Sequence, residues 1–472
     1  MAGKQEIELI AHLMRRAGFG ATRDEIERRA EQGYEATVEE LLNPQGQPEV
    51  DEYMLYRYLP MTEIAFSHVQ GVTHWLYYMI HTRRHLQEKM ALFYHHLFAT
   101  GDAKVNAPNH MVGQVQMFRN HGMGSYKELL VLLAKDPAMI FWLDNNLNHK
   151  GAPNENWGRE LLELFSMGVG SYTESDVLEC SRAFTGWTIG AKIPTSPYGR
   201  FYWRFAYRPE DHDSSEKTFL GNTGRLNGED VIDIIVRQPA CTARFISRHL
   251  YNFFVADEPP VPLWPSEPPR DPEAIRTVSD AFVNSGYEMK PVLRTLFNSD
   301  FFKDAIYQKV RSPIEVFVGT VRLTRDLEGP APGLPIIEPV AKEPGYMGQS
   351  ILDPPSVEGW HTGQGWINSG TLAQRINFVT DRVSNTDLPG VQDIVERVAS
   401  EGTSMAPDAF VDWCLDLIGP LRVEDPTRAE LEAHVETDGP LGWATDEGLA
   451  DLSRRVGDTL ALIASTREYQ FG

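Results

Sequence analysis

The residues with the clearest chemical potential lie in a short segment that is otherwise rich in leucine. If residues 156–167 form a helix, its 3.6-residue period places Asn156, Glu160 and Glu163 on one line. Leucines and a phenylalanine cover the other faces, and a helix that is apolar nearly all round is usually buried. Two carboxylates one turn apart on such a helix repel each other and lose hydration, so a cation, a proton or an arginine must compensate them.

Arg159 is the structural candidate for that compensation. It is spaced to pair with Glu163 four residues later and with Glu155 four residues earlier. An ion-pair network of this kind and a metal or catalytic site are both compatible with the pattern. Both alternatives therefore stay open at the level of the sequence.

A second polar stripe occurs in the stretch from residue 72 to residue 98, which is rich in aromatic residues and histidine. Glu88 and His95 are two helical turns apart on a common face. They could bind a metal only if another helix closed the coordination shell, and the helix with Glu160 and Glu163 is the candidate. We therefore expect Glu88, His95, Glu160 and Glu163 as ligands of iron, manganese or zinc.

Further candidates lie outside these two helices. His212 belongs to a compact polar trio with Asp213 and Lys217 in an irregular region, where a catalytic loop and a simple Asx-turn are both plausible. The candidates for catalysis are Glu160, Glu163, Arg159 and His212. The candidates for binding a cofactor are Asn156, Trp187 and Trp360, although tryptophan more often fills a core.

The pattern of the whole chain predicts a mainly α-helical fold, a large multi-helix bundle with a small irregular β-hairpin insertion near residues 195–222. Helical periodicity recurs along the sequence and strand signals are sparse. We expect a helical domain over residues 1–380, with insertions at 188–222 and at the proline-rich 256–272. Residues 381–472 are expected to form an acidic helical subdomain.

Composition excludes several classes of function. The formal net charge of −22 disfavours binding to nucleic acid and to anionic membranes, and no run of 18 apolar residues could span a bilayer. The three cysteines are far apart and lack a CxxC partner, which indicates reduced core thiols. The N-terminal residues lack the features of a secretory signal, so we expect a cytoplasmic location.

Several motifs together resemble the bacterial "domain of unknown function 1800" family between about residues 10 and 380. The motifs are His12-Leu13 with Arg15, Arg16 and Gly18-Phe19-Gly20; Glu88-Lys89 with Phe93-Tyr94-His95; Asp136-Pro137-Ala138-Met139; Asn154-Glu155-Asn156 with Arg159-Glu160-Leu161 and Glu163-Leu164-Phe165; Phe184-Thr185-Gly186-Trp187; His212-Asp213 with Lys217-Thr218; and Asp353-Pro354-Pro355 to Trp360.

The resemblance implies a predominantly helical protein whose relatives are often encoded beside a second family related to sulfatases. A partner protein from that family is therefore expected. Many relatives carry export signals. The family usually has His-x-His near His95, whereas Leu97 occupies the second histidine position here.

Three functions are compatible with these observations. The first is a metal-dependent enzyme, for example an oxidoreductase, acting on a small molecule or a peptide; the Glu-x-x-His motifs of di-iron bundles are lacking in the expected places. The second is a metal-free hydrolase or transferase, in which Glu160 or Glu163 is the general acid and His95 or His212 the base. The third is a non-enzymatic scaffold that binds a partner protein.

Overall fold

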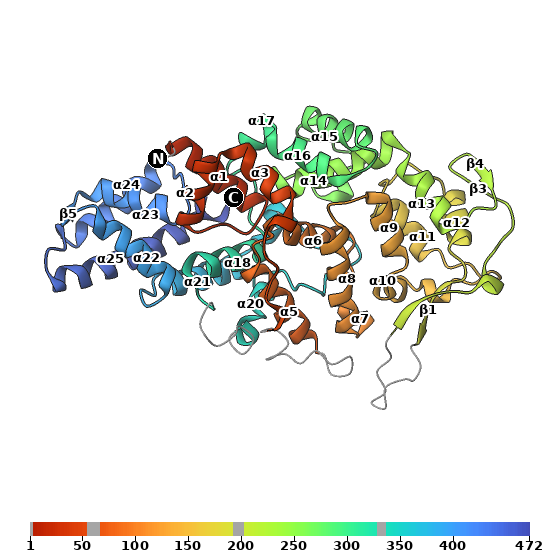
Figure 1. Cartoon of the computed structure of the whole chain (residues 1–472), viewed down its shortest axis with the longest axis horizontal. Helices are drawn as coiled ribbons and strands as arrows, with labels where there is room; N and C mark the ends of the chain where they lie inside the picture. Colours follow the sequence, from red (N-terminus) through yellow and green to blue (C-terminus); the bar gives the residue numbers. More distant parts are fainter. Residues whose placement is uncertain (1–2, 54–66, 192–202, 328–336) are drawn as a thin grey trace.

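The structure is a computed structural model that describes residues 3–53, 67–191, 203–327 and 337–472. It is mainly α-helical, as the sequence predicts, and its few strands form three small two-stranded antiparallel sheets. Figure 1 shows the C-terminal helices at one end of the molecule, α9 to α13 at the other, and α1 to α3 between them.

The N-terminal half forms most of the central helical body. Its packing is dense around α6, which contacts α3, α5 and α8 and is buried on nearly every face. The helices of this half are α1 (Lys4–Arg16), α2 (Arg23–Gln32), α3 (Tyr34–Leu42), α5 (His68–His81), α6 (His85–Leu97), α7 (Asp102–Val105), α8 (Pro108–His121), α9 (Tyr126–Ala134), α10 (Pro137–Trp142), α11 (Asn156–Glu163) and α12 (Glu174–Ala183).

The predicted insertion is a hairpin that begins earlier than expected. Strand β2 (Trp203–Tyr207) pairs with β1 (Trp187–Ala191), which directly follows α12, and Trp187 lies opposite Tyr207. The segment that connects these strands, residues 192–202, lies outside the described residues. A second hairpin joins β3 (Lys217–Phe219) to β4 (Asn222–Gly224). The expectation of a small β insertion is confirmed, whereas its start moves to residue 187.

The helices after the insertion cover the top of the central body in Figure 1 and lead to the C-terminal group. The proline-rich segment is irregular over residues 256–271 apart from one 3-10 turn at Val261–Leu263, and α15 begins at Pro272. The remaining elements are α13 (Gly228–Val236), α14 (Arg244–Phe254), α15 (Pro272–Asn284), α16 (Met289–Asn298), α17 (Asp300–Lys303), α18 (Pro313–Thr324), α20 (Glu343–Tyr346), α21 (Ser369–Val383), α22 (Pro389–Ser400), β5 (Ser404–Met405), α23 (Pro407–Leu417), α24 (Asp425–Thr437), β6 (Leu441–Gly442) and α25 (Asp446–Ser465).

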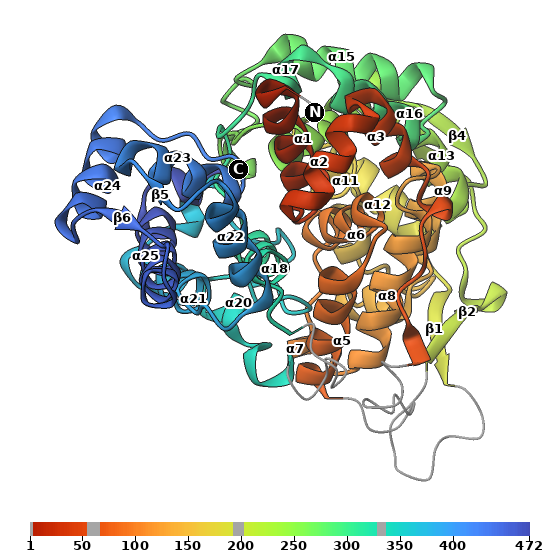
Figure 2. The same cartoon turned by 60° about the vertical axis from the view of Figure 1, so that its left-hand side comes forward.

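The C-terminal helices α22 to α25 lie together beside α21 and α18 (Figure 2). They also meet the N-terminus, since Arg23 of α2 pairs with Asp416 and Arg397 of α22 pairs with Glu27. A buried carboxylate joins the central helices: Glu315 at the start of α18 pairs with Arg16 of α1 and Lys89 of α6. Burial outside this group is mostly apolar, and Cys180 and Cys414 are buried thiols, as expected.

Candidate functional site

The helix that carries the two central carboxylates is shorter than predicted. α11 ends at Glu163 instead of extending to residue 167, because the next amide groups bond further back. The amide of Phe165 donates to the carbonyl of Glu160, and that of Met167 donates to Leu162, both five residues earlier rather than four. Glu160 and Glu163 therefore occupy the last turn of α11.

Close packing against α12 fixes the position of this turn. A Cβ atom at Gly158 would lie 2.4 Å from Oγ of Ser181, so only glycine allows the two helices to approach this closely. Thr173 and Asp176 form a capping box at the start of α12. α11 and α12 thus form a helix hairpin, and the carboxylates of α11 are held on a rigid support.

Glu160 is a half-buried carboxylate without a charge partner. In the described part of the chain its side chain accepts no hydrogen bond. Burial raises its pKa to about 7, and the charges of Glu163 and Glu358 act in the same direction, while Arg159 opposes them. Glu160 is therefore a carboxyl group that exists in both protonation states near neutral pH.

Glu163 is a neighbour with a different environment. Its carboxylate accepts a hydrogen bond of 2.9 Å from the hydroxyl of Tyr172, which lies in the turn between α11 and α12. Burial and this hydrogen bond raise the pKa of Tyr172, so the phenol keeps its proton and remains a donor. Glu163 and Glu358 both line a cleft of about 460 Å³.

The loop that supplies Glu358 is held against α6 by its next residue. Gly359 has a φ of +82°, and a Cβ atom there would lie 2.6 Å from the backbone oxygen of His96. Glycine is needed for both reasons, since other residues rarely adopt this conformation and would clash. A segment about 200 residues away in sequence thereby brings a third carboxylate towards α11.

α14 and the proline-rich segment also contribute to the cleft. Arg244 and Arg248 line it, together with Trp264. The guanidinium of Arg248 lies 4.4 Å from the centre of the Trp264 ring and pairs with Glu258 at 2.7 Å. The cleft is therefore lined by carboxylates as well as by arginines and an indole.

Arg159 faces away from this arrangement. It pairs with Glu174 at 2.7 Å and with Glu155 at 3.1 Å, so the predicted pair with Glu155 is present, whereas the predicted pair with Glu163 is not formed among the described residues. Asn156, at the start of α11, is exposed and donates to Asp144 at 3.4 Å. These two predicted site residues are thus part of the outer surface of α11.

Glu88 and His95 of α6 are buried in the protein core and have hydrogen-bond partners there. Glu88 accepts hydrogen bonds from Nε1 of Trp75 at 2.6 Å and from Nε and Nη2 of Arg119 at 2.6 and 2.8 Å. Nε2 of His95 accepts from the amide of Leu352 at 3.0 Å, and burial lowers the pKa of His95 to about 3. His95 is therefore a neutral histidine at physiological pH.

The structure does not assemble the four expected metal ligands. Among the described residues, no group of three or more histidine, cysteine, aspartate or glutamate side chains has a geometry that could hold a metal ion. The lone pairs of Glu88 are used by Trp75 and Arg119, and Nε2 of His95 is used by a backbone amide. The residues present thus do not fit the expected iron, manganese or zinc site.

The remaining predicted residues stabilise local structure. Nδ1 of His212 lies 2.9 Å from the carbonyl oxygen of Thr185, and Trp187 donates to Asn227 at 2.9 Å while packing against Phe184. Trp360 lies against the rings of His95 and His96. None of these side chains lines the cleft beside Glu163.

Sequence reasoning missed three residues of the cleft, namely Glu358, Arg244 and Arg248, and it also missed Tyr172, the hydrogen-bond partner of Glu163. Arg244 and Arg248 have a visible signal, because their spacing of four residues places them on one face of a helix. Glu358 stands next to the Gly359-Trp360 motif, but only the path of the chain shows which helix it meets.

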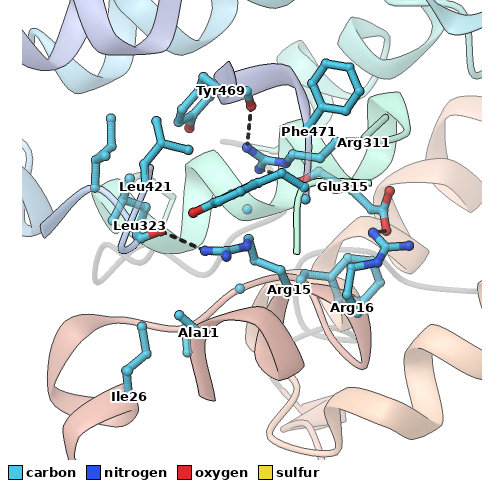
Figure 3. A pocket seen from close by; sticks show the side chains of 18 residues that line it. Ala11, Arg15, Arg16, Ile26, Arg311, Glu315, Leu323, Leu421, Tyr469 and Phe471 are labelled. Atoms are coloured by element: carbon cyan, nitrogen blue, oxygen red, sulfur yellow. Dashed lines mark hydrogen bonds and ion pairs between the residues drawn. The ribbon is translucent and has the colours of Figure 1, made fainter. Parts of the chain in front are cut away.

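A second, smaller cleft of about 60 Å³ lies where α1, α18 and residues 418–472 meet. Figure 3 shows Arg15, Arg16 and Arg311 converging on it, with Glu315 paired to Arg16. Arg15 donates to the carbonyl of Gly419, and Arg311 donates to the carbonyl of Tyr469. These contacts tie the C-terminal segment to the central body.

Comparison with known proteins identifies the family. The family model described as "Protein of unknown function (DUF1800)" matches residues 12–471, and the chain belongs to this family. The match includes the C-terminal helices, beyond residue 380 where the resemblance in the sequence motifs ends. No curated protein and no solved structure matches the chain. None of the described helices is long and apolar enough to cross a membrane.

Proposed function

We propose that the chain is an enzyme that uses Glu160 and Glu163 for acid–base catalysis of a hydrolysis or group-transfer reaction. The observation that carries the proposal is the environment of Glu160, whose pKa is raised to about 7 and whose neighbour Glu163, three residues later on α11, lines the cleft. A catalytic acid or base works best when its pKa is close to the operating pH. Perturbed carboxyls in clefts are for the same reason candidates for catalysis.

The two carboxyls differ in a way that suits different roles. Glu160 has no hydrogen-bond partner among the described residues and is the group that gains and loses the proton. Glu163 is fixed by Tyr172, and its negative charge helps to keep the proton on Glu160. Pairs of carboxyl groups in contrasting environments are typical of acid–base catalysis.

In this proposal Glu160, in its protonated form, donates to the leaving group of the bound substrate. The resulting carboxylate then accepts a proton from the water or second substrate that completes the reaction. The proposal assigns no step to a metal, because the expected ligands are not brought together. His95 and His212 have no part in it either, since Nε2 of His95 accepts from the amide of Leu352 and Nδ1 of His212 lies 2.9 Å from the carbonyl oxygen of Thr185.

The test is hydrolysis of a panel of chromogenic carboxylic esters, phosphate esters, sulfate esters and glycosides, with and without a chelator. We expect turnover that survives the chelator and falls about 100-fold or more in Glu160→Gln. The matched control is Glu174→Gln, which removes an exposed carboxylate paired with Arg159. The proposal is wrong if Glu160→Gln keeps the wild-type rate and pH profile.

A further inference from the structure

The two arginines that line the cleft indicate which class of substrate binds there. Arg244 and Arg248 are one turn apart on α14, and both line the cleft that Glu163 borders. Among the described residues they form no ion pair with Glu163 or Glu358, which line the same cleft. A bound molecule therefore meets both cationic and anionic side chains.

One hydrogen-bond donor of Arg248 is unpaired among the described residues. It is 4% exposed; its Nε donates to Glu258 at 2.7 Å and its Nη1 to the carbonyl of Glu267 at 3.1 Å. Its Nη2 is buried and has no partner in the described structure. Because an unpaired buried donor is costly, such an atom at the wall of a cleft indicates a ligand that accepts from it.

Arg244 adds a second free cation. Its guanidinium forms no hydrogen bond or ion pair within the described residues, and the side chain is exposed at the cleft. The acidic chain places carboxylates beside many of its other arginines, for example Glu258 beside Arg248 and Glu174 beside Arg159. Arg244 is thus free to bind an anionic group together with Arg248.

An apolar surface lies next to the two arginines. The indole of Trp264 donates through Nε1 to the carbonyl of Pro259 at 2.7 Å, and its ring packs on His249 at 4.5 Å. The ring of Phe245 also lines the cleft and packs on His249. A fixed aromatic surface of this kind suits a ring or another flat apolar group.

We propose that the substrate of this site carries one anionic group, a carboxylate or a phosphate, that binds Arg244 and Arg248, next to a ring that packs on Trp264. This inference rests on the proposed function only where it calls the bound molecule a substrate. The carboxylates of Glu163 and Glu358 would repel a second anionic group. The part of the molecule that faces these carboxylates is therefore uncharged or a hydrogen-bond donor.

The test is binding of three small probes to the full chain, measured by ligand-observed NMR and titration calorimetry. Benzoate and phenyl phosphate represent the carboxylate and phosphate sources, and benzyl alcohol is the neutral control of similar shape. We expect one or both anions to bind at least about tenfold more tightly than benzyl alcohol. Preference between the two anions identifies the anionic group.

Two variants locate the binding. Arg244→Gln is expected to weaken the preferred anion about tenfold, because a charge-assisted contact is lost. Arg248→Lys keeps a positive charge beside Glu258 but removes the planar guanidinium with its paired donors. It should weaken binding of the same anion without loss of folding. The matched control is Arg276→Gln, an exposed arginine on α15 that pairs only with Glu273 among the described residues and should bind as the wild type does.

The outcomes separate this inference from the proposed function. Equal binding of benzyl alcohol and the anions, wild-type binding by Arg244→Gln and Arg248→Lys, or no binding to the wild type would each overturn the inference. Glu160→Gln should keep anion binding while it loses turnover. Anion binding through Arg244 with unchanged turnover in Glu160→Gln would instead overturn the proposed function and leave the anion site in place.

Discussion

Helices α6 and α11 both carry carboxylates on a largely apolar background, yet these carboxylates differ in burial and in hydrogen bonding. Glu88 of α6 is fully buried and receives three hydrogen bonds from Trp75 and Arg119. Glu160 of α11 is only half-buried, receives none within the described residues, and has a pKa of about 7. Burial alone does not make a carboxylate reactive; the number of partners that the rest of the fold supplies decides it.

In α6 the carboxylate therefore has a structural role, whereas α11 carries the carboxyl groups of the proposed acid–base chemistry. A buried charge with full hydrogen bonding stabilises the fold and costs much when one partner is removed. A partly buried carboxyl without partners contributes little to stability and gains a proton near neutral pH. Variants of the two helices should therefore affect different properties.

The largest effect is expected from breaking the pair on α6. Arg119→Met should lower the free energy of unfolding by about 3–5 kcal/mol, because it leaves the Glu88 carboxylate buried without its cation. Urea denaturation measures this change. The double variant Glu88→Gln, Arg119→Met removes both charges and should regain part of the loss; a single variant as stable as wild type would contradict the structural role of α6.

A second large effect concerns acid stability. The Lys89 ammonium and the Arg16 guanidinium hold the pKa of the buried Glu315 carboxyl well below its ordinary value near 4.5. Because this folded-state pKa is depressed, the stability it contributes is complete above about pH 4.5 and is lost as the pH falls below that value. Glu315→Gln should be less stable than wild type at pH 7, and this difference should shrink towards pH 3. A constant difference across that range would show that Glu315 does not titrate as described.

A smaller effect, of opposite sign, is expected at Glu160. Its raised folded-state pKa means that wild type loses stability as the pH rises from about 4.5 to 7, where the unfolded chain ionises first. Glu160→Gln cannot ionise, so it should gain stability relative to wild type between pH 5 and pH 8. Thermal unfolding at the two pH values checks the sign, and a variant that loses stability at both would favour a structural role.

The smallest effect is expected at Arg159. Its pairs with Glu155 and Glu174 lie at the surface, where ion pairs contribute little, so Arg159→Gln should leave the unfolding midpoint unchanged. Arg159 lowers the pKa of Glu160, and its removal should therefore raise that pKa further. A large loss of stability would instead show that the main role of α11 is structural, through the ion pairs of Arg159.

Local patterns predicted most of the helices, because each depends on periodicity and capping residues near in sequence. The capping box of Thr173 and Asp176 is one example, and the break between α8 and α9 near Gly122 and Gly124 is another. The start of the β insertion was missed, since the pairing of Trp187 with Tyr207 depends on a contact across residues 192–202.

Part of the candidate site was predicted because it also depends on local helix geometry. The line of Glu160 and Glu163 follows from helix geometry, whereas the partners of Glu88 come from Trp75 and Arg119 on other helices. A pattern of carboxylates and histidines cannot show which of them have already been paired. The metal set of Glu88, His95, Glu160 and Glu163 was inferred from residue type, and tertiary contacts use two of its members elsewhere.

The most direct test is an infrared titration of Glu160 that requires no substrate. The difference spectrum between wild type and Glu160→Gln isolates the band of one protonated carboxyl, and its amplitude is followed from pH 4 to pH 9. We expect a midpoint near pH 7, which moves down in Glu163→Gln because a neighbouring negative charge is removed. A midpoint near the ordinary glutamate value of about 4.3, unchanged in Glu163→Gln, would contradict the assignment of acid–base chemistry to α11.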